Sequence, residues 1–377
     1  EDYWLYSCFV IMTRRLSWRN FDFLLLGAIV LASAFGTVMI RSAVAGNEVL
    51  LPLISRQIYF AMLGVALIFL VASIDYRYWL ALYRPIYIGI LIFLVTLTGF
   101  GQSAFGAQRW FQVGVLFLQP TEFAKIVAVL VLARYFEHAQ NQRRDWRWAL
   151  GGFLWVFGII VLILLQPNLS NVVVLTVIFF SMLWIQGLEI RQVITLVLSV
   201  IGLAALAFPF LEQYQQDRVL TFIFPDPNAT YGATYNVQQA LIAIGSGGFF
   251  GQGYGHGTQT QLRFLKVRHT DFIFSAVSEE FGMIGGVIII LTLAFIVWRC
   301  IRAAQKSRDV SGSMIAYGVA ILIFFQGAVN IGVNLNVVPV SGLPLPFISY
   351  GGSGLTALML GIGLVESVVM RHKQMEF

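Results

Sequence analysis

Residues 265–282 read Leu-Lys-Val-Arg-His-Thr-Asp-Phe-Ile-Phe-Ser-Ala-Val-Ser-Glu-Glu-Phe-Gly, so charged and polar groups stand at the mouth of a long apolar run. If a helix begins at Asp271, its carboxylate shares one face with the small polar residues Ser275 and Ser278. An ionisable group at the edge of hydrocarbon is costly and is usually functional, so Asp271 is a candidate acid or base. The alternative is that Asp271 only caps the helix, because a carboxylate satisfies free amides at a helix start.

The composition around this stretch is that of a membrane protein. Of 377 residues 58% are hydrophobic and only 11% are charged, and the mean hydropathy is +0.80. The net charge of +6 is spread between apolar runs. That distribution suits orientation in a bilayer and argues against nucleic acid as a partner.

Two other features narrow the interpretation. The two cysteines, Cys8 and Cys300, argue against a disulfide framework or a thiolate metal site. Met12-Thr13-Arg14-Arg15 resembles a natural start, so residues 1–11 are interpreted as an extension or expression remnant. The first apolar run has spanning length without a small-residue cleavage site after it, so no cleavable signal peptide is expected.

Ten apolar segments are long enough to cross a bilayer. They are residues 21–40, 58–74, 85–100, 121–136, 149–165, 172–185, 193–211, 272–301, 314–333 and 354–370. The sequence therefore predicts an all-α polytopic membrane protein with about ten transmembrane helices in a single domain, residues 12–377. An even number puts both termini on one side, and the distribution of Lys and Arg predicts that this side is cytoplasmic. The external side then receives residues 100–120, 166–168, 212–271 and 338–353, the third of these a long loop between helices 7 and 8.

The first external segment carries Trp110 and leads into Gln119-Pro120-Thr121-Glu122 and Lys125. It is too short and polar to span, so we expect it to lie in the membrane interface. Trp110 is either an interface anchor or a substrate contact. Proline at 120 suits the first turn of a helix, on which Glu122 and Lys125 are neighbours that form a structural ion pair or take part in chemistry.

The long external loop is predicted to contain an amphipathic helix over residues 235–243, followed by seven glycines between 245 and 257. No strand precedes these glycines, so they indicate a tight or ligand-hugging backbone and no nucleotide loop. Lys266 and Arg268 abut Asp271 and could hold phosphate or contact anionic lipid.

Residues 339–354 hold three prolines and four glycines between two apolar spans, and Ser349 and Tyr350 lie in this turn. Non-helical backbone at membrane depth is tolerated only where protein or a cavity covers it. With Asn330, Asn334 and Asn336 before it, the turn is interpreted as the wall of a polar cavity. No zincin, triad or P-loop spacing occurs, and His256 and His269 are too far apart for a metal pair.

Four motifs together make the chain from about Trp18 to its end resemble the SEDS family (shape, elongation, division and sporulation), the RodA and FtsW proteins of bacteria. The motifs are Gly106-Ala107-Gln108-Arg109-Trp110 leading to 119–125; Gln166-Pro167-Asn168; Arg268-His269-Thr270-Asp271-Phe272-Ile273-Phe274 with Glu279-Glu280-x-Gly282; and 339–354. The short termini and the Arg-His-Thr-Asp motif look more like RodA than FtsW.

The resemblance implies a peptidoglycan glycosyltransferase that polymerises lipid II on the outer face of the bacterial cytoplasmic membrane during cell-wall elongation. It also implies a class B penicillin-binding protein as partner, and membrane lipids and the undecaprenyl-pyrophosphate glycan chain as ligands. In the family the aspartate matching Asp271 is essential, which favours chemistry over capping. The substrate-binding candidates that follow are Trp110, Glu122, Lys125, Lys266, Arg268, His269, Ser349 and Tyr350. Asn168 stands where the family often has an aspartate, so the role of that carboxylate is in doubt here.

Transfer of a sugar from the growing chain to the acceptor 4-hydroxyl inverts the anomeric centre, so one in-line attack with a general base suffices. The hypothesis is that Asp271 takes the acceptor proton or binds a divalent cation, Mg²⁺ or Mn²⁺, while Lys125, Lys266 and Arg268 stabilise pyrophosphate. No organic cofactor is expected. Two alternatives stay open: a lipid II flippase, and a scaffold for the transpeptidase in which Asp271 is dispensable.

Overall fold

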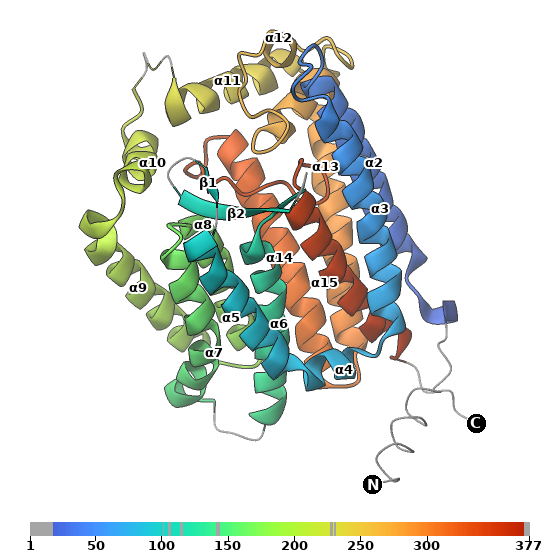
Figure 1. Cartoon of the computed structure of the whole chain (residues 1–377), viewed down its shortest axis with the longest axis vertical. Helices are drawn as coiled ribbons and strands as arrows, with labels where there is room; N and C mark the ends of the chain where they lie inside the picture. The colour runs from blue at the N-terminus through green and yellow to red at the C-terminus, as the bar shows by residue number, and fades with distance from the viewer. Residues whose placement is uncertain are drawn as a thin grey trace.

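The structure is a bundle of ten long helices capped at one end by shorter helices and a small sheet (Figure 1). This computed structural model describes residues 18–100, 102–104, 107–113, 116–140, 144–226, 229 and 231–372, with no side-chain description for 98–100, 102–104, 107–110, 112–113, 116–117 and 204. The ten long helices are α2 (Phe23–Ala43), α3 (Pro52–Ser73), α5 (Tyr83–Phe100), α6 (Pro120–His138), α7 (Trp146–Leu164), α8 (Leu169–Ile185), α9 (Ile190–Ala207), α13 (Ile273–Lys306), α14 (Val310–Asn334) and α15 (Gly352–Met370).

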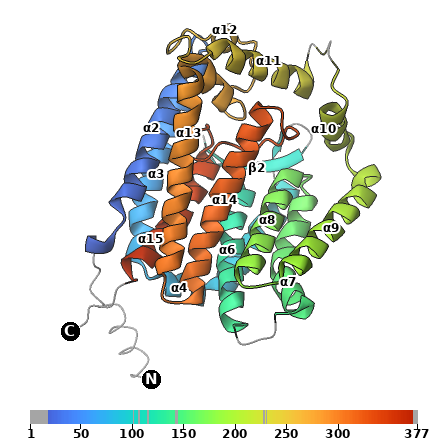
Figure 2. The same cartoon turned by 180° about the vertical axis from the view of Figure 1, so that it is seen from behind.

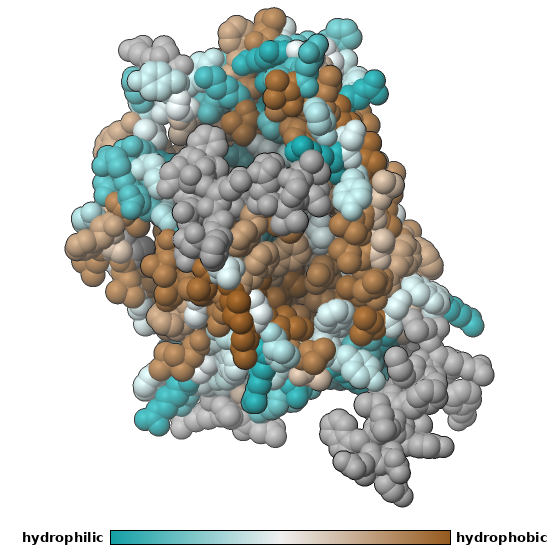
Figure 3. All heavy atoms as spheres, viewed as in Figure 1, coloured by the Kyte–Doolittle hydropathy of each residue, from teal (hydrophilic) through white to brown (hydrophobic). Residues whose placement is uncertain are grey.

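These helices occupy the ten apolar segments expected from the sequence. Seven of the described helices are long and apolar enough to cross a membrane, and Tyr83–Leu97 and Leu169–Ile185 are shorter apolar helices. On the face shown in Figure 3, apolar residues form a broad band across the middle of the molecule, with polar residues toward both ends. The helical membrane-protein class is therefore confirmed, while the number of spans stays a prediction.

The core of the bundle lies along α15, α6 and α14. Most of α15 is buried, and α6 buries Glu122 and Lys125 together with its apolar side chains. Glycines allow α15 to pack closely on its neighbours: a Cβ on Gly363 would lie 2.8 Å from Val71 of α3. In the view from behind, α13 and α14 cross the face of the bundle and α8 and α9 stand beside them (Figure 2).

The external segments contain more structure than the sequence predicted. In the first external segment β1 (Gln102–Ala104), β2 (Ala107–Val113) and β3 (Leu116–Leu118) form a small antiparallel sheet, which the sequence did not predict in this otherwise helical protein. The amphipathic helix expected over 235–243 is confirmed as α11 (Gly232–Gly247). Two further helices, α10 (Gln213–Ile223) and α12 (Thr258–Gln261), were not expected.

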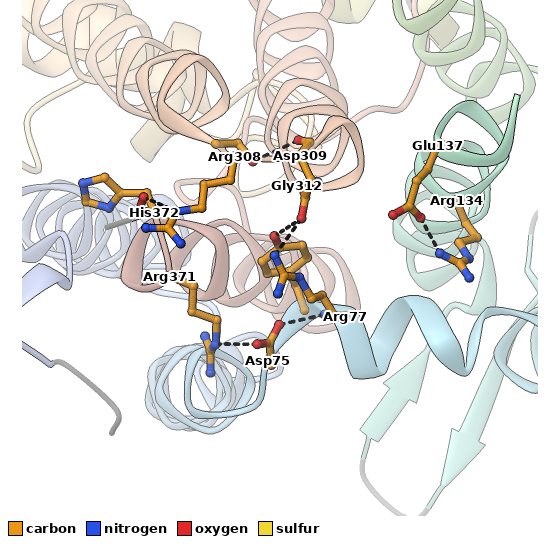
Figure 4. A network of polar contacts seen from close by, with 11 residues as sticks. Asp75, Arg77, Arg134, Glu137, Arg308, Asp309, Gly312, Arg371 and His372 are labelled. Carbon is orange, nitrogen blue, oxygen red and sulfur yellow. Dashed lines mark hydrogen bonds and ion pairs between the residues drawn. The ribbon is translucent and has the colours of Figure 1, made fainter. Parts of the chain in front are cut away.

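Both described ends of the chain lie at the opposite end of the bundle from this cap. The amide of Asp22, just before α2, donates to Glu366 near the end of α15. Ion pairs join other helix ends there: Asp75, before α4 (Tyr76–Ala81), binds Arg371, and Arg77 binds Asp309 (Figure 4). An even number of long helices accounts for this arrangement.

Helix α13 is broken at Gly282, where φ is +66° and ψ is −162°. This backbone region is accessible essentially only to glycine. The glycine-rich loop covers the break: the amides of Gln252 and Gly253 donate to the carbonyls of Glu279 and Glu280 at 3.0 and 2.9 Å. The loop thus satisfies backbone carbonyls that the broken helix leaves without an intrahelical partner.

We expect Gly282→Ala to lower stability by about 3 kcal/mol, because the backbone region is forbidden and the new Cβ would lie 2.4 Å from the nitrogen of Gly251. Thermal unfolding of the purified protein measures the effect. Gly27→Ala is the matched control, since a Cβ at Gly27 meets no atom within 4 Å. Equal melting temperatures for the two variants would contradict this explanation of the break.

Candidate functional site

A cavity of about 500 Å³ opens between α6, α8, α10, α14 and the segment 338–344. Its wall carries polar groups from four separated parts of the chain. They include Glu122, Asn168, Asn171, Gln215, Arg218 and Ser341. Apolar side chains such as Phe325 and Val329 line the rest. A concave, largely apolar site with a few converging polar groups is the usual form of a ligand pocket of this size.

The backbone of Asp271 is fixed beside this cavity by two asparagines of α14. Asn330 and Asn334 each donate from Nδ2 to the Asp271 carbonyl, at 3.0 and 2.9 Å. Asn334 also accepts from the amide and hydroxyl of Ser275, at 3.0 and 2.6 Å. The buried asparagines thus hold the start of α13 and leave the Asp271 side chain free to serve another purpose.

The carboxylate of Asp271 points toward the segment that walls the cavity. Its Oδ2 is 3.9 Å from the place where a Cβ on Gly342 would stand, and Gly342 lines the cavity. The N-cap of α13 is Phe272 and has no side-chain cap bond, so Asp271 does not cap this helix. Burial raises the pKa of the Asp271 carboxyl to about 6, and the charge of Arg218 opposes that rise. A partly buried carboxyl with a raised pKa beside a cavity is the usual setting of a general base.

Glu122 and Lys125 form a buried ion pair in the first turns of α6. Both Glu122 oxygens accept from Lys125 Nζ at 2.8 Å, and the two residues are 5% and 1% exposed. Glu122 lines the cavity, and its Oε2 is 3.3 Å from the position of a Cβ on Gly354. The pair is therefore both structural and accessible to a ligand through its carboxylate side.

The cations next to Asp271 in sequence do not line the cavity in the described structure. Arg268 is buried and donates to the carbonyls of Ala43 and Leu265 at 2.5 and 3.4 Å. Lys266 is exposed and lies over the ring of Tyr235 at 5.9 Å. Arg268 therefore holds the loop to the end of α2.

His269, Ser349 and Tyr350, three of the substrate-binding candidates, lie close together, and they are joined largely through the backbone. Ser349 Oγ donates to the Thr270 carbonyl at 2.7 Å, and the Tyr350 amide donates to the His269 carbonyl at 2.9 Å. The rings of His269 and Tyr350 are 6.1 Å apart. Burial, reinforced by the charge of Arg268, lowers the pKa of His269, so the ring is neutral at pH 7.

The tryptophan candidate lies in strand β2, where Trp110 pairs with Gln102. Its side chain falls outside the described part of the structure. The assignment of Trp110 as a substrate contact stays a prediction.

Arg218 is the functional candidate that sequence reasoning missed. It lies on α10, lines the cavity, and is the cation whose charge acts on Asp271. Tyr214, one turn earlier, has its ring 5.8 Å from the Arg218 guanidinium. The sequence feature that could have indicated Arg218 is the short polar segment Gln213-Tyr214-Gln215-Gln216-Asp217-Arg218, which lies between the seventh span and the turn at Pro225.

The acidic pair after Asp271 is structural. Glu279 accepts from the amides of Gln259 and Thr260 at 2.6 and 3.0 Å and from the Thr260 hydroxyl at 2.7 Å. Glu280 accepts from the hydroxyl of Ser42. These carboxylates anchor α12 and the end of α2 to α13.

The residues near Asp271 offer few ligands for a divalent cation. The described residues contain no cluster of three or more His, Cys, Asp or Glu side chains. Mg²⁺, however, commonly uses one or two carboxylates together with substrate phosphates and water. Beside Asp271 the backbone at Gly342 leaves room that a side chain would fill. The residues therefore fit an ion held mainly by a phosphorylated substrate and only partly by the protein.

Comparison with known proteins gives consistent matches along nearly the whole chain. Residues 14–374 match the model of the FtsW/RodA/SpoVE family, described as cell cycle protein. The chain is 33% identical to peptidoglycan glycosyltransferase MrdB of Escherichia coli K12, over 92% of this chain and 93% of that protein. It is 34% identical to stage V sporulation protein E of Bacillus subtilis, over 83% and 86% of the two chains.

Solved structures agree with these sequence matches. A chain of a peptidoglycan synthase complex, described under "Structural coordination of polymerization and crosslinking by a peptidoglycan synthase complex", superposes with a TM-score of 0.79 and 31% identity, covering 95% of this chain and all of the other. The rod shape determining protein RodA of Thermus thermophilus superposes with a TM-score of 0.71 and 31% identity, covering 95% and 99%.

Proposed function

The chain belongs to the FtsW/RodA/SpoVE family, and from this premise we propose that it is a peptidoglycan glycosyltransferase that polymerises lipid II into glycan strands. The observation that carries the proposal is the position of Asp271, a carboxyl with raised pKa beside a cavity of about 500 Å³. RodA-type elongation is preferred over the FtsW role because the short termini and the motif at 268–271 favour it.

In the proposed reaction the 4-hydroxyl of the acceptor sugar attacks the anomeric carbon of the growing chain. Asp271 accepts the hydroxyl proton as the new glycosidic bond forms. The bond from the anomeric carbon to pyrophosphate breaks, and undecaprenyl pyrophosphate leaves. One displacement of this kind inverts the configuration and requires no second carboxylate as nucleophile.

Cationic groups in the cavity and directly behind its wall would stabilise the leaving pyrophosphate. Arg218 is the best candidate, because it lines the cavity and acts electrostatically on Asp271. Lys125 contributes through its pair with Glu122, and Tyr214 positions the guanidinium by lying beneath it. His269, Ser349 and Tyr350 hold the Asp271 loop by the contacts described above. Lys266 and Trp110 stay candidates for substrate contact from the sequence alone.

A divalent cation, Mg²⁺ or Mn²⁺, is proposed to bind together with the pyrophosphate of the substrate. When bound it would neutralise charge that develops on the leaving group. The alternative role of Asp271 is to hold this cation in place of accepting the proton, because its carboxylate faces the open space beside Gly342.

We place the capped end of the bundle outside the bacterial cytoplasmic membrane and both termini in the cytoplasm, since the basic residues concentrate at the end opposite the cap. An external site meets lipid II after its export. The proposed partner is a class B penicillin-binding protein that cross-links the product. The likeness to a chain of a peptidoglycan synthase complex that coordinates polymerization and crosslinking supports this choice of partner.

Polymerisation is expected to lose activity in acid. Asp271 must be ionised to accept a proton, and its pKa is about 6, so the rate rises with pH up to about 6 and levels off above it. Below that value the rate falls about tenfold per pH unit. Because Arg218 lowers the pKa of Asp271, Arg218→Gln should move the midpoint to higher pH and Arg218→Lys should restore it. Glycan yield across a pH series tests this, and a midpoint unchanged in Arg218→Gln would count against the assignment.

An assay of glycan formation in detergent distinguishes the proposed polymerase from the transport and scaffold alternatives. The test uses purified protein with its partner made inactive as a transpeptidase, together with lipid II and Mg²⁺. A polymerase forms glycan in micelles, where no membrane separates two compartments. Absence of glycan under verified conditions, with lipid II crossing the bilayer of reconstituted vesicles, would favour a flippase. Absence of both activities would favour a scaffold.

A further inference from the structure

A second cavity lies at the end of the bundle opposite Asp271, between the beginning of α2 and the ends of α13 and α15. Its volume is about 320 Å³. We propose that this cavity binds the phosphate headgroup of an anionic phospholipid. The proposal goes beyond the glycosyltransferase reaction, because none of the groups described above for that reaction lies here.

Three cations on one face of α13 line the cavity. Arg299, Arg302 and Lys306 follow at intervals of three and four residues, which places them on the same side of a helix. Asp22 is the one carboxylate among the lining residues, so the wall carries an excess of positive charge.

The carboxylate of Asp22 neutralises only Arg299. Arg299 Nε donates to Asp22 Oδ2 at 2.7 Å, and the other Asp22 oxygen accepts from the amide of Leu25 at 3.1 Å. Arg302 lies over the ring of Trp298 at 5.3 Å. Within the described ranges, neither Arg302 nor Lys306 forms an ion pair. Two cations are therefore available to an anion that enters the cavity.

The remaining wall identifies the anion as part of a lipid. Phe23 and Leu24, which line the cavity, are 61% and 64% exposed on the outer face of α2. Leu291 of α13, eight residues before Arg299, is 62% exposed, and α13 is apolar enough to cross a membrane. Helices α2 and α13 run side by side away from this cavity (Figure 2). A diester phosphate at the cations would thus continue directly into acyl chains on an apolar surface.

The other basic residues named at this end of the bundle do not contribute to the proposed lipid site. Arg308 donates from Nε to the carbonyl of His372 at 2.6 Å, which commits its guanidinium to the chain end (Figure 4). Arg147 and Arg191 lie at the same end of the bundle on α7 and α9 but do not line the cavity. Arg147 lies over Trp146 at 5.6 Å, much as Arg302 lies over Trp298. These two arginines therefore provide a matched control of equal charge change.

The test measures lipid binding to the delipidated full chain in detergent by native mass spectrometry, with phosphatidylglycerol and phosphatidylcholine as probes. Wild type should hold one phosphatidylglycerol in preference to phosphatidylcholine. Each cation near a lipid surface contributes about fivefold in affinity, so Arg302→Gln/Lys306→Gln should weaken that binding about 30-fold. Arg147→Gln/Arg191→Gln should leave it unchanged.

Three results would overturn the proposal. Equal losses in the two double variants would assign the binding to net charge alone, and no loss in either would place the lipid elsewhere. If millimolar glycerol 3-phosphate displaced the lipid from the wild-type protein, the cavity would be a site for a soluble phosphate. Thermal unfolding verifies the fold of each variant, and Lys306→Gln alone, a change at an exposed side chain, should still weaken binding about fivefold.

Discussion

Asp271→Asn is expected to lower the rate of glycan polymerisation about 100-fold or more and to leave stability at pH 7 unchanged or higher. The rate falls because an amide cannot accept the proton of the attacking hydroxyl, and general-base catalysis contributes about 10²–10⁴-fold. Stability does not fall because the carboxylate is not a helix cap and accepts no hydrogen bond from any described residue. Its pKa is raised to about 6, so at pH 7 the charge of Asp271 costs free energy on folding, and a neutral Asn removes that cost.

The control for this variant is Asp217→Asn. Asp217 is an exposed carboxylate on α10, one residue from Arg218, and Gln213 donates to it at 3.1 Å. It should polymerise at the wild-type rate. Melting temperature and lipid II binding are measured on both variants. If Asp271→Asn lost stability together with activity, the carboxylate would be structural and the proposed base would have to lie elsewhere.

Lys125→Met is expected to destabilise the protein by about 3–5 kcal/mol, the usual cost of leaving one member of a buried ion pair without its partner. Lys125 is 1% exposed and supplies both close contacts of the Glu122 carboxylate. The double variant Glu122→Gln/Lys125→Met removes both charges and should recover most of that loss. Chemical unfolding in detergent gives the free energies of the wild type, both single variants and the double variant.

The polymerisation rates of the wild type, the two single variants and the double variant show whether the Glu122–Lys125 pair is only structural or also functional. Because Glu122 lines the cavity, the double variant should polymerise at least about tenfold more slowly than wild type, although its stability is restored. Arg134 and Glu137 provide the control pair, since they lie three residues apart on the same helix at its other end. A stable double variant with wild-type activity would remove Glu122 and Lys125 from the site.

Much of the fold could be predicted from the sequence because hydrocarbon selects long apolar helices. All ten expected segments are helical, with ends within four residues except at α3, which begins six residues earlier at Pro52, and α13, which ends five residues later at Lys306. The amphipathic helix at 232–247 was also visible as a periodic pattern in a polar loop. The expectation that the turn at 339–354 walls a cavity agrees with its place in the lining at Ser341 and Gly342.

The remainder depended on contacts between distant parts of the chain. Arg268 is next to Asp271 in sequence, yet its guanidinium is turned to the Ala43 carbonyl at the end of α2. Arg218 is 53 residues from Asp271 and acts on it only because α10 folds over the cavity. The break at Gly282 has the same character, since the loop that covers it begins more than 30 residues earlier. Local patterns cannot report such pairings.

The most direct test of the central claim is glycan formation from lipid II by wild type and Asp271→Asn side by side. Both are purified with the same transpeptidase-inactive partner and supplied with Mg²⁺, and the products are separated on a gel. Our account predicts a ladder of glycan strands from wild type and none from Asp271→Asn under conditions in which both proteins are folded and bind lipid II. Equal ladders from the two proteins would contradict it.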